Sequence, residues 1–178
     1  MITLLLGGAR SGKSALAVEL GRRHEGPVVF VATCPPLDDE LAERIARHRA
    51  DRPDWPTVEE PLDVAPVVAG AGDALVVVDC LTLWVSNLMR RGDDDASILA
   101  AATELANVAA GRGAPTIVVS NEVGMGIHPA QELGRRYRDV LGNVNRIVAG
   151  VASTTLLLVA GRAVRLDDPL ALVGDATA

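Results

Sequence analysis

Aromatic residues and lysine are scarce in this sequence of 178 residues. The scarcity of aromatic side chains means that the core has to be built from Val, Leu, Ile and Ala, which contribute to an apolar content of 49%. The two cysteines, Cys34 and Cys80, are far apart and form no C-x-x-C pattern, so we expect two buried, reduced thiols. The four aromatic residues are Phe30, Trp55, Trp84 and Tyr137.

The sequence also lacks a long apolar run and an excess of positive charge. No run reaches the roughly 18–20 apolar residues that cross a membrane. The net charge of −6, with a pI near 5.0, argues against general binding to nucleic acid or to a membrane surface. Met1 leads directly into an apolar strand and not into a signal peptide. We therefore expect a soluble, cytoplasmic protein with neither nucleic acid nor membrane as a partner.

Length and composition predict one domain, because 178 residues suffice for a single core and no internal repeat or linker is visible. We expect a nucleotide-binding catalytic domain over residues 1–166. A C-terminal tail over residues 167–178 is expected to be partly disordered.

The one lysine among 17 basic residues stands in a phosphate-binding pattern, G-x-x-x-x-G-K-[ST]. An apolar strand precedes the motif and a helix follows it, which is the context that a P-loop requires. Its residues are Gly7, Gly8, Ala9, Arg10, Ser11, Gly12, Lys13 and Ser14.

This motif predicts binding of a nucleoside triphosphate or a similar polyphosphate. The glycines let backbone N–H groups surround an anion, and the positive end of the helix dipole adds to the attraction. Lys13 would reach the β- and γ-phosphates, and the Ser14 hydroxyl would ligate Mg²⁺. The alternative is a glycine turn that happens to end in Lys-Ser.

Five apolar runs alternate with helical segments, which predicts an α/β fold of the P-loop NTPase type, with a mostly parallel, RecA-like sheet covered on both faces. The strands are expected at Ile2–Leu6, Val28–Ala32, Leu75–Val78, Thr116–Val119 and Thr155–Val159. The helices are expected at Lys13–His24, Asp38–Ala50, Leu62–Ala69, Leu81–Arg90, Ala96–Gly111 and Ala130–Ala149. The stretch Asp51–Thr57 is expected to be a loop.

Ligands of such sheets bind at the carboxyl ends of the strands, so polar residues directly after each apolar run are candidates. Asp79 ends the run Val76–Val78 in the Walker B pattern and is predicted to hold Mg²⁺, although many strands end in Asp for no functional reason. Asn121–Pro129 follows another strand. It is either an ordinary turn or a loop at the ligand edge, and it lacks the Asn-Lys-x-Asp pattern of switch-type GTPases.

Two clusters of charged residues in the expected helix 38–50 each have a purely structural and a functional interpretation. The acidic group Asp38–Glu40 either compensates the helix dipole or contacts Mg²⁺ or substrate. His48 lies among arginines at the other end, which indicates either a solvated basic helix end or an anion-binding arm. Neighbouring arginines favour the neutral imidazole, and a neutral imidazole can act as a nucleophile toward phosphorus.

Taken in order, these motifs resemble the bifunctional adenosylcobinamide kinase / adenosylcobinamide-phosphate guanylyltransferase family of cobalamin biosynthesis. The resemblance spans about residues 1–165. Its P-loop is generic, whereas its most specific parts are one block inside the expected helix 38–50 and one block after the expected strand 116–119. These blocks are Arg44–Arg49 and Asn121–Ile127.

The resemblance implies two reactions. A nucleoside triphosphate first phosphorylates the aminopropanol hydroxyl of adenosylcobinamide, with ATP as an alternative donor to GTP. GTP then donates GMP to adenosylcobinamide phosphate through a guanylylated histidine, giving adenosylcobinamide-GDP and pyrophosphate. His48 matches that histidine, and Lys13 is the second expected catalytic residue. Beyond the P-loop, the family's GTP contacts correspond to Ala32, Thr33, Cys34, Arg49, Ala50, Asp51, Arg52, Glu60 and Asp79.

Two other functions remain open at this point. A plain P-loop small-molecule kinase would transfer only the γ-phosphate, and a nucleotide-binding regulator would show no turnover with a corrinoid. The resemblance also implies a homo-oligomer, a trimer. The apolar helix Leu81–Met89 would then be either a contact between subunits or ordinary core.

Overall fold

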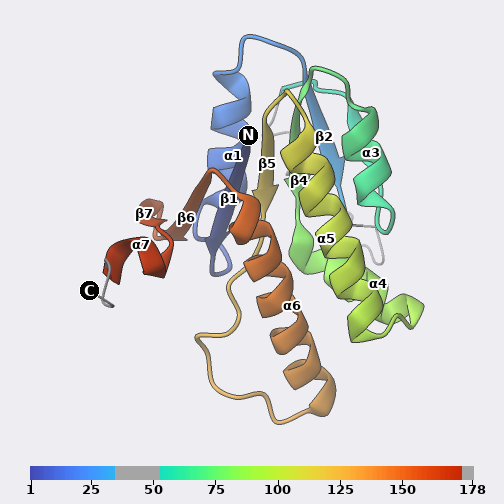
Figure 1. Ribbon diagram of the computed structural model, residues 1–178, viewed down its shortest axis with the longest axis vertical. Helices are drawn as coiled ribbons and strands as arrows, with labels where there is room; N and C mark the ends of the chain where they lie inside the picture. The colour runs from blue at the N-terminus through green and yellow to red at the C-terminus, as the bar shows by residue number, and fades with distance from the viewer. Residues whose placement is uncertain (35–52, 174–178) are drawn as a thin grey trace.

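Seven strands form one sheet in the computed structural model, which describes residues 1–34 and 53–173 (Figure 1). The strand order is β3-β2-β4-β5-β1-β6-β7, and every pair is parallel except the antiparallel pair β6–β7. The expectation of a mostly parallel sheet is therefore confirmed. The strands are β1 (Ile2–Gly7), β2 (Val28–Ala32), β3 (Thr57–Glu59), β4 (Leu75–Asp79), β5 (Thr116–Val119), β6 (Thr154–Val159) and β7 (Arg162–Leu166).

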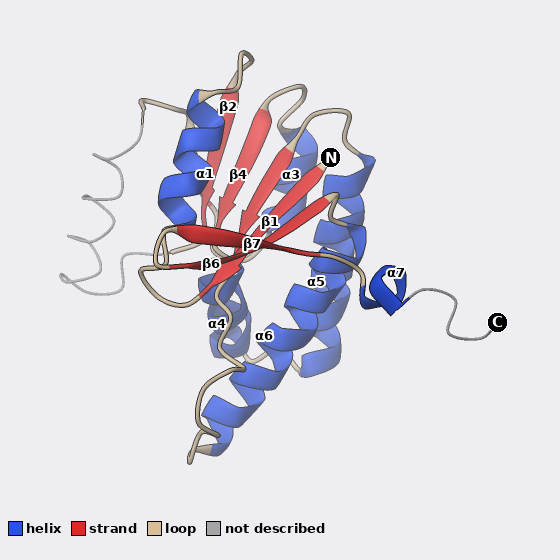
Figure 2. Cartoon of the chain, turned by 90° about the vertical axis from the view of Figure 1, so that its left-hand side faces the viewer, coloured by secondary structure: helices blue, strands red, loops and turns tan. Residues whose placement is uncertain are grey.

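Helices cover both faces of the sheet, as predicted (Figure 2). The helix after the P-loop packs on one face, and four others pack on the opposite face. The described helices are α1 (Lys13–Arg22), α3 (Val64–Gly70), α4 (Leu81–Arg91), α5 (Asp95–Gly111), α6 (Glu132–Val151) and α7 (Pro169–Val173).

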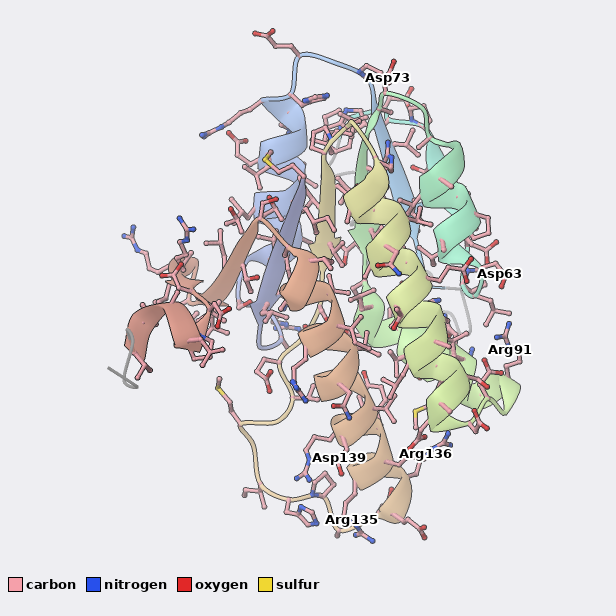
Figure 3. The ribbon with its side chains drawn as sticks, viewed as in Figure 1. Asp63, Asp73, Arg91, Arg135, Arg136 and Asp139 are labelled. Atoms are coloured by element: carbon pink, nitrogen blue, oxygen red, sulfur yellow. The ribbon has the colours of Figure 1, made fainter. Side chains whose placement is uncertain are left out.

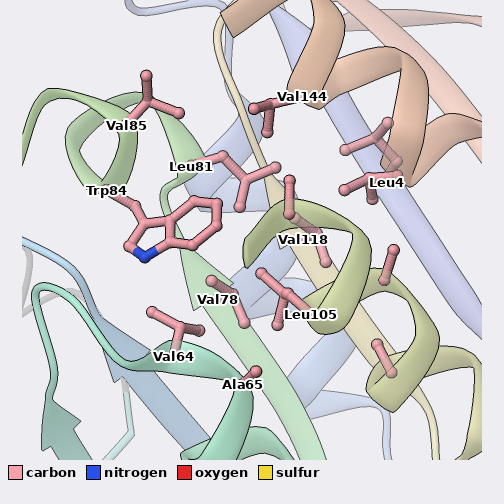
Figure 4. Close-up of a cluster of buried hydrophobic side chains, with 14 of the residues drawn as sticks. Leu4, Val64, Ala65, Val78, Leu81, Trp84, Val85, Leu105, Val118 and Val144 are labelled. Carbon is pink, nitrogen blue, oxygen red and sulfur yellow. The ribbon is translucent and has the colours of Figure 1, made fainter. Parts of the chain in front are cut away.

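The central strands are buried on both sides because their side chains alternate between the two helical layers. In β1, Leu4 lies in the core under α3–α6, and Leu5 lies in the core under α1. Both are 0% exposed. The core is mainly aliphatic, as expected, but it also contains Phe30 on the α1 side of the sheet and Trp84 on the other side. Figure 4 shows Trp84 among its aliphatic neighbours.

Helix α4 contributes to the core of the single chain. Leu81, Trp84, Val85 and Leu88 are each no more than 1% exposed. The Trp84 Nε1 atom donates a hydrogen bond of 2.7 Å to the Leu62 carbonyl oxygen. Of the two interpretations of this helix, the structure supports core packing for its apolar face.

All five expected strands are present, while two further strands were not predicted. Strand β3 has three residues and begins in the proline-rich stretch for which a loop was predicted. Strand β7 has the sequence Arg-Ala-Val-Arg-Leu, in which two arginines interrupt the apolar residues, and it is exposed along its whole length. It turns back on β6 through Ala160 and Gly161, both at positive φ. Helix α7 lies within the expected tail.

The expected helix 38–50 lies outside the described residues. Within residues 1–34 and 53–173, no helix is both long and apolar enough to cross a membrane.

Candidate active site

The P-loop connects β1 to α1 at the carboxyl edge of the sheet, and its backbone explains its glycines. Gly7 has φ 150°, and a Cβ atom there would lie 2.4 Å from the Leu158 carbonyl oxygen. Gly12, at φ 102°, precedes the first residue of α1. Both positions are unfavourable for a residue with a side chain. Arg10 also adopts positive φ, at 58°, so the loop is tightly curled around the space in front of α1.

The Lys13 ammonium lies within this curl and is only 7% exposed. Its Nζ atom donates to the carbonyl oxygens of Gly7 at 2.9 Å and Gly8 at 2.7 Å, and it lies 3.4 Å from Ser11 Oγ. Among the residues that the structure describes, Lys13 forms no ion pair with a carboxylate, and these neutral groups hold the cation. A phosphate oxygen could therefore replace one of these neutral acceptors and form a stronger, charge-assisted hydrogen bond.

Electrostatics link Lys13 to the end of β4. Burial lowers the pKa of Lys13, while the nearby Cys80 and Asp79 act in the opposite direction. Burial, together with the Asp79 carboxylate, raises the pKa of the Cys80 thiol to about 11. Lys13 and Asp79 are thus close enough for each to sense the other's charge, as a P-loop and a Walker B residue should be.

Ser14 and Asp79 offer one hydroxyl and one carboxylate for a metal ion. In the part of the chain that the structure describes, no group of three or more His, Cys, Asp or Glu residues is placed to hold a metal. Mg²⁺ in nucleotide enzymes usually takes one or two protein oxygens and completes its shell with phosphates and water. The donor set present therefore fits Mg²⁺ that arrives with a nucleotide.

Two hydrogen bonds join Thr33 and Cys80, which follow the adjacent strands β2 and β4. Thr33 Oγ1 donates to the Cys80 carbonyl oxygen at 2.7 Å and accepts from the Cys80 N–H at 2.8 Å. Thr33 is 0% exposed. In this structure its side chain fixes the backbone beside Asp79, and its predicted contact with GTP stays a prediction.

Asn87 and Glu60 reinforce the same edge. Asn87 Nδ2 donates to the carbonyl oxygens of Thr33 at 2.7 Å and Pro61 at 3.1 Å. Glu60 Oε1 accepts from the N–H groups of Leu62 and Asp63, both at 2.8 Å, ahead of α3. The carboxylate of Glu60, predicted to bind GTP, therefore orders a turn here. The sequence analysis did not identify Asn87. The feature that could have indicated its role is that it is a polar residue on the buried face of an apolar helix.

The other predicted positions on these strands are placed at the same edge. Ala32 ends β2, and its carbonyl oxygen accepts from the Glu60 N–H at 2.9 Å. Cys34 follows Thr33 and, like Cys80, is reduced and half-buried, although full burial was expected for both.

The first residues of the loop after β5 contact the P-loop. The Glu122 N–H donates to the Gly7 carbonyl oxygen at 3.1 Å. The Asn121 N–H donates to Thr82 Oγ1 at 2.8 Å, and Asn145 Nδ2 donates to the Asn121 carbonyl oxygen at 3.0 Å. The turn between β6 and β7 also contacts the P-loop, because the Gly161 N–H donates to the Ser11 carbonyl oxygen at 3.0 Å.

The structure thus places these predicted residues along the carboxyl edge of the sheet: the P-loop, Asp79, Thr33, Cys34, Ala32, Glu60 and the start of the loop 121–131. Glu60 follows the edge strand β3, four strands away from β1 and its P-loop. The remaining predicted residues lie outside the described residues. They are Asp38, Asp39, Glu40, His48, Arg49, Ala50, Asp51 and Arg52.

A solved structure with a similar fold is a prototypical ATPase from the type III secretion system of pathogenic bacteria. The TM-score is 0.56 at 13% sequence identity, over 88% of this chain and 50% of that chain, so this chain spans half of the ATPase chain. Together with the strand order, this likeness confirms the predicted P-loop NTPase-type, RecA-like fold.

Comparison of the sequence with known proteins identifies the family. The chain is 41% identical over 169 residues to the bifunctional adenosylcobalamin biosynthesis protein CobP of Pseudomonas aeruginosa, covering 90% of this chain and 94% of that protein. It is 36% identical over 188 residues to the corresponding protein CobU of Salmonella typhimurium, covering 93% and 99%. A family model described as cobinamide kinase / cobinamide phosphate guanyltransferase matches residues 3–166. The chain therefore belongs to the cobinamide kinase / cobinamide phosphate guanyltransferase family.

Proposed function

We propose that this chain phosphorylates adenosylcobinamide and then transfers GMP from GTP to adenosylcobinamide phosphate. The observation that carries the proposal is the Lys13 ammonium, held by the Gly7 and Gly8 carbonyl oxygens beside Asp79, in a chain of this family. The nucleotides would be GTP, with ATP as an alternative phosphoryl donor. The catalytic domain would span residues 1–166 and act in the cytoplasm.

The kinase step requires positioning and charge neutralisation more than covalent help. The aminopropanol hydroxyl oxygen attacks the γ-phosphorus, and the nucleoside diphosphate leaves. Lys13 and the N–H groups of the P-loop would hold the phosphates and stabilise charge on the transferred group. Ser14 and Asp79 would hold Mg²⁺, which supplies further neutralisation of phosphate charge.

The guanylyl transfer step proposed here uses His48 as the nucleophile. One imidazole nitrogen attacks the α-phosphorus of GTP, and pyrophosphate leaves. A phosphate oxygen of adenosylcobinamide phosphate then attacks the same phosphorus, so that the P–N bond breaks and adenosylcobinamide-GDP forms. Lys13 would stabilise the departing pyrophosphate. Further contacts to GTP are proposed for Ala32, Thr33, Cys34, Arg49, Ala50, Asp51, Arg52 and Glu60.

The first test replaces His48 by Ala and incubates the protein with Mg²⁺ and GTP labelled at the α-phosphate. We expect wild type to acquire a protein-bound label that is labile in acid and stable in alkali, because a phosphoramidate has those properties. The His48→Ala variant should acquire none, yet should still transfer the γ-phosphate to adenosylcobinamide.

A matched control for this experiment is His24→Ala, since His24 lies in the turn after α1 and should keep full labelling. Absence of label in wild type, with γ-phosphate transfer intact, would mean a plain P-loop kinase. Binding of nucleotide without turnover of any corrinoid would mean a regulator.

We also propose that the protein is a homotrimer. Light scattering in solution should then give about three times the chain mass of 18.6 kDa. A mass of one chain would exclude the trimer. Since the apolar face of α4 is buried within the single chain, the subunit contact has to use other surfaces.

A further inference from the structure

The loop 121–131, between β5 and α6, is tied to the rest of the molecule at both ends. At its start, the Glu122 N–H bonds the Gly7 carbonyl oxygen of the P-loop, and Asn121 is held by Thr82 and Asn145. Figure 1 shows the loop leaving β5 at the P-loop edge of the sheet and running along α6 to the helix's far end.

The other end of the loop is held by arginines of α6. Arg135 Nη1 donates to the carbonyl oxygens of Pro129 at 3.1 Å and Ala130 at 2.6 Å. Arg138 Nη1 lies 2.8 Å from His128 Nδ1. Figure 3 places Arg135 at the end of the molecule where the loop meets α6. Arg135 and Arg138 therefore position the end of this loop.

Between these attachments the loop presents apolar side chains to solvent. Met125 is 79% exposed and Ile127 is 97% exposed. A large contiguous apolar surface marks an interaction site, and two such side chains on one loop would contribute to one. These two lie two residues apart on a segment that begins one hydrogen bond away from the phosphate-binding loop.

We propose that Met125 and Ile127 contact the corrin macrocycle of the acceptor substrate. This inference rests on the proposed function. The hydroxyl that receives the phosphoryl group has to reach the P-loop, but the macrocycle that carries it is far larger than the group transferred. The macrocycle must therefore extend beyond the P-loop over an adjacent surface, and the loop 121–131 is continuous with the P-loop through Gly7.

The composition of the chain supports an aliphatic contact. Macrocycles are commonly held by aromatic side chains, but Phe30 and Trp84 are buried and the hydroxyl of Tyr137 bonds the Thr82 carbonyl oxygen. Trp55 packs against Gly21 of α1, where a Cβ atom would lie 2.5 Å from its ring. Met and Ile are thus the large apolar side chains that this loop offers, and the flexible Met adapts to an irregular surface.

The test uses the full chain with both residues replaced, Met125→Ser with Ile127→Ser. The matched control is Leu170→Ser with Leu172→Ser on α7, an equally exposed pair at 80% and 71%. Equilibrium dialysis measures adenosylcobinamide binding by corrin absorbance. In parallel, KM for adenosylcobinamide, labelling by α-labelled GTP and mass in solution are determined.

We expect Kd and KM for adenosylcobinamide to rise about tenfold in the loop variant, which is a modest share of what burying two such side chains contributes. The loop variant should match wild type in labelling by GTP and in solution mass. The control variant should match wild type in every measurement. Unchanged Kd and KM would overturn the inference. If the loop variant lost adenosylcobinamide binding and its solution mass also fell, the inference would be overturned, and the loop would be part of a subunit interface.

The inference and the proposed function can fail separately. If wild type binds adenosylcobinamide but neither phosphorylates it nor becomes guanylylated, the proposed function fails and the dialysis still tests the loop. If wild type performs both reactions and the loop variant binds normally, only the inference fails.

Discussion

The Lys13→Met variant is expected to lose both nucleotide-dependent reactions, with kcat for each falling by about 10²–10³-fold. Lys13 Nζ already points into the curl of the P-loop, where it donates to Gly7 and Gly8. Methionine has a similar length but cannot stabilise the negative charge that develops on the transferred phosphoryl group or on the departing pyrophosphate. In the proposed mechanism both reactions use the triphosphate site around Lys13, so both rates should fall.

The measurement is the initial rate of adenosylcobinamide phosphorylation and the rate of protein labelling by α-labelled GTP. Arg23→Met is the matched control, because Arg23 is an exposed cation directly after α1 whose ion pair, within the described part of the chain, is with Glu19 at 2.8 Å. A Lys13→Arg variant should also be impaired, since the guanidinium fork does not fit a site shaped for a compact ammonium. Rates within threefold of wild type for Lys13→Met would rule out a P-loop mechanism.

Trp84→Ala is expected to lower the free energy of unfolding by about 3–5 kcal/mol. The indole is 1% exposed in the larger core cluster, where α3, α4 and α5 meet (Figure 4). Its removal leaves a cavity and also leaves the Leu62 carbonyl oxygen without the Nε1 donor. A Trp84→Phe variant keeps most of the packing and should lose less stability.

Chemical denaturation measures these changes. Leu170→Ala is the control, because a side chain that is 80% exposed should alter stability by no more than about 0.5 kcal/mol. Solution mass is measured on the same samples. Core packing would be contradicted if Trp84→Ala lowered the free energy of unfolding by less than about 1 kcal/mol and also lowered the solution mass of the assembly. That result would indicate that α4 forms a subunit contact.

The agreement between expected and observed strands has a local cause. Residues of β1, β2, β4, β5 and β6 are near-continuous apolar runs, and such runs are typical of strands buried on both faces. Strand β7 has no near-continuous run because Arg162 and Arg165 interrupt its apolar residues, and all five of its residues are exposed. Only the pairing with β6, after a turn at Ala160 and Gly161, makes it a strand.

The P-loop, the predicted Walker B position of Asp79 and the alternation of strands and helices can all be read from the sequence, because each depends on neighbouring residues along the chain. The Glu60 carboxylate likewise bonds N–H groups only two and three residues away. The roles of Thr33 and Asn87, by contrast, depend on the folded chain. Their hydrogen bonds join strand ends and helices that are distant in sequence, Thr33 with Cys80 and Asn87 with Thr33, and no local pattern reports such a pairing. The same is true of the loop 121–131, whose attachment to Gly7 exists only because β5 lies next to β1.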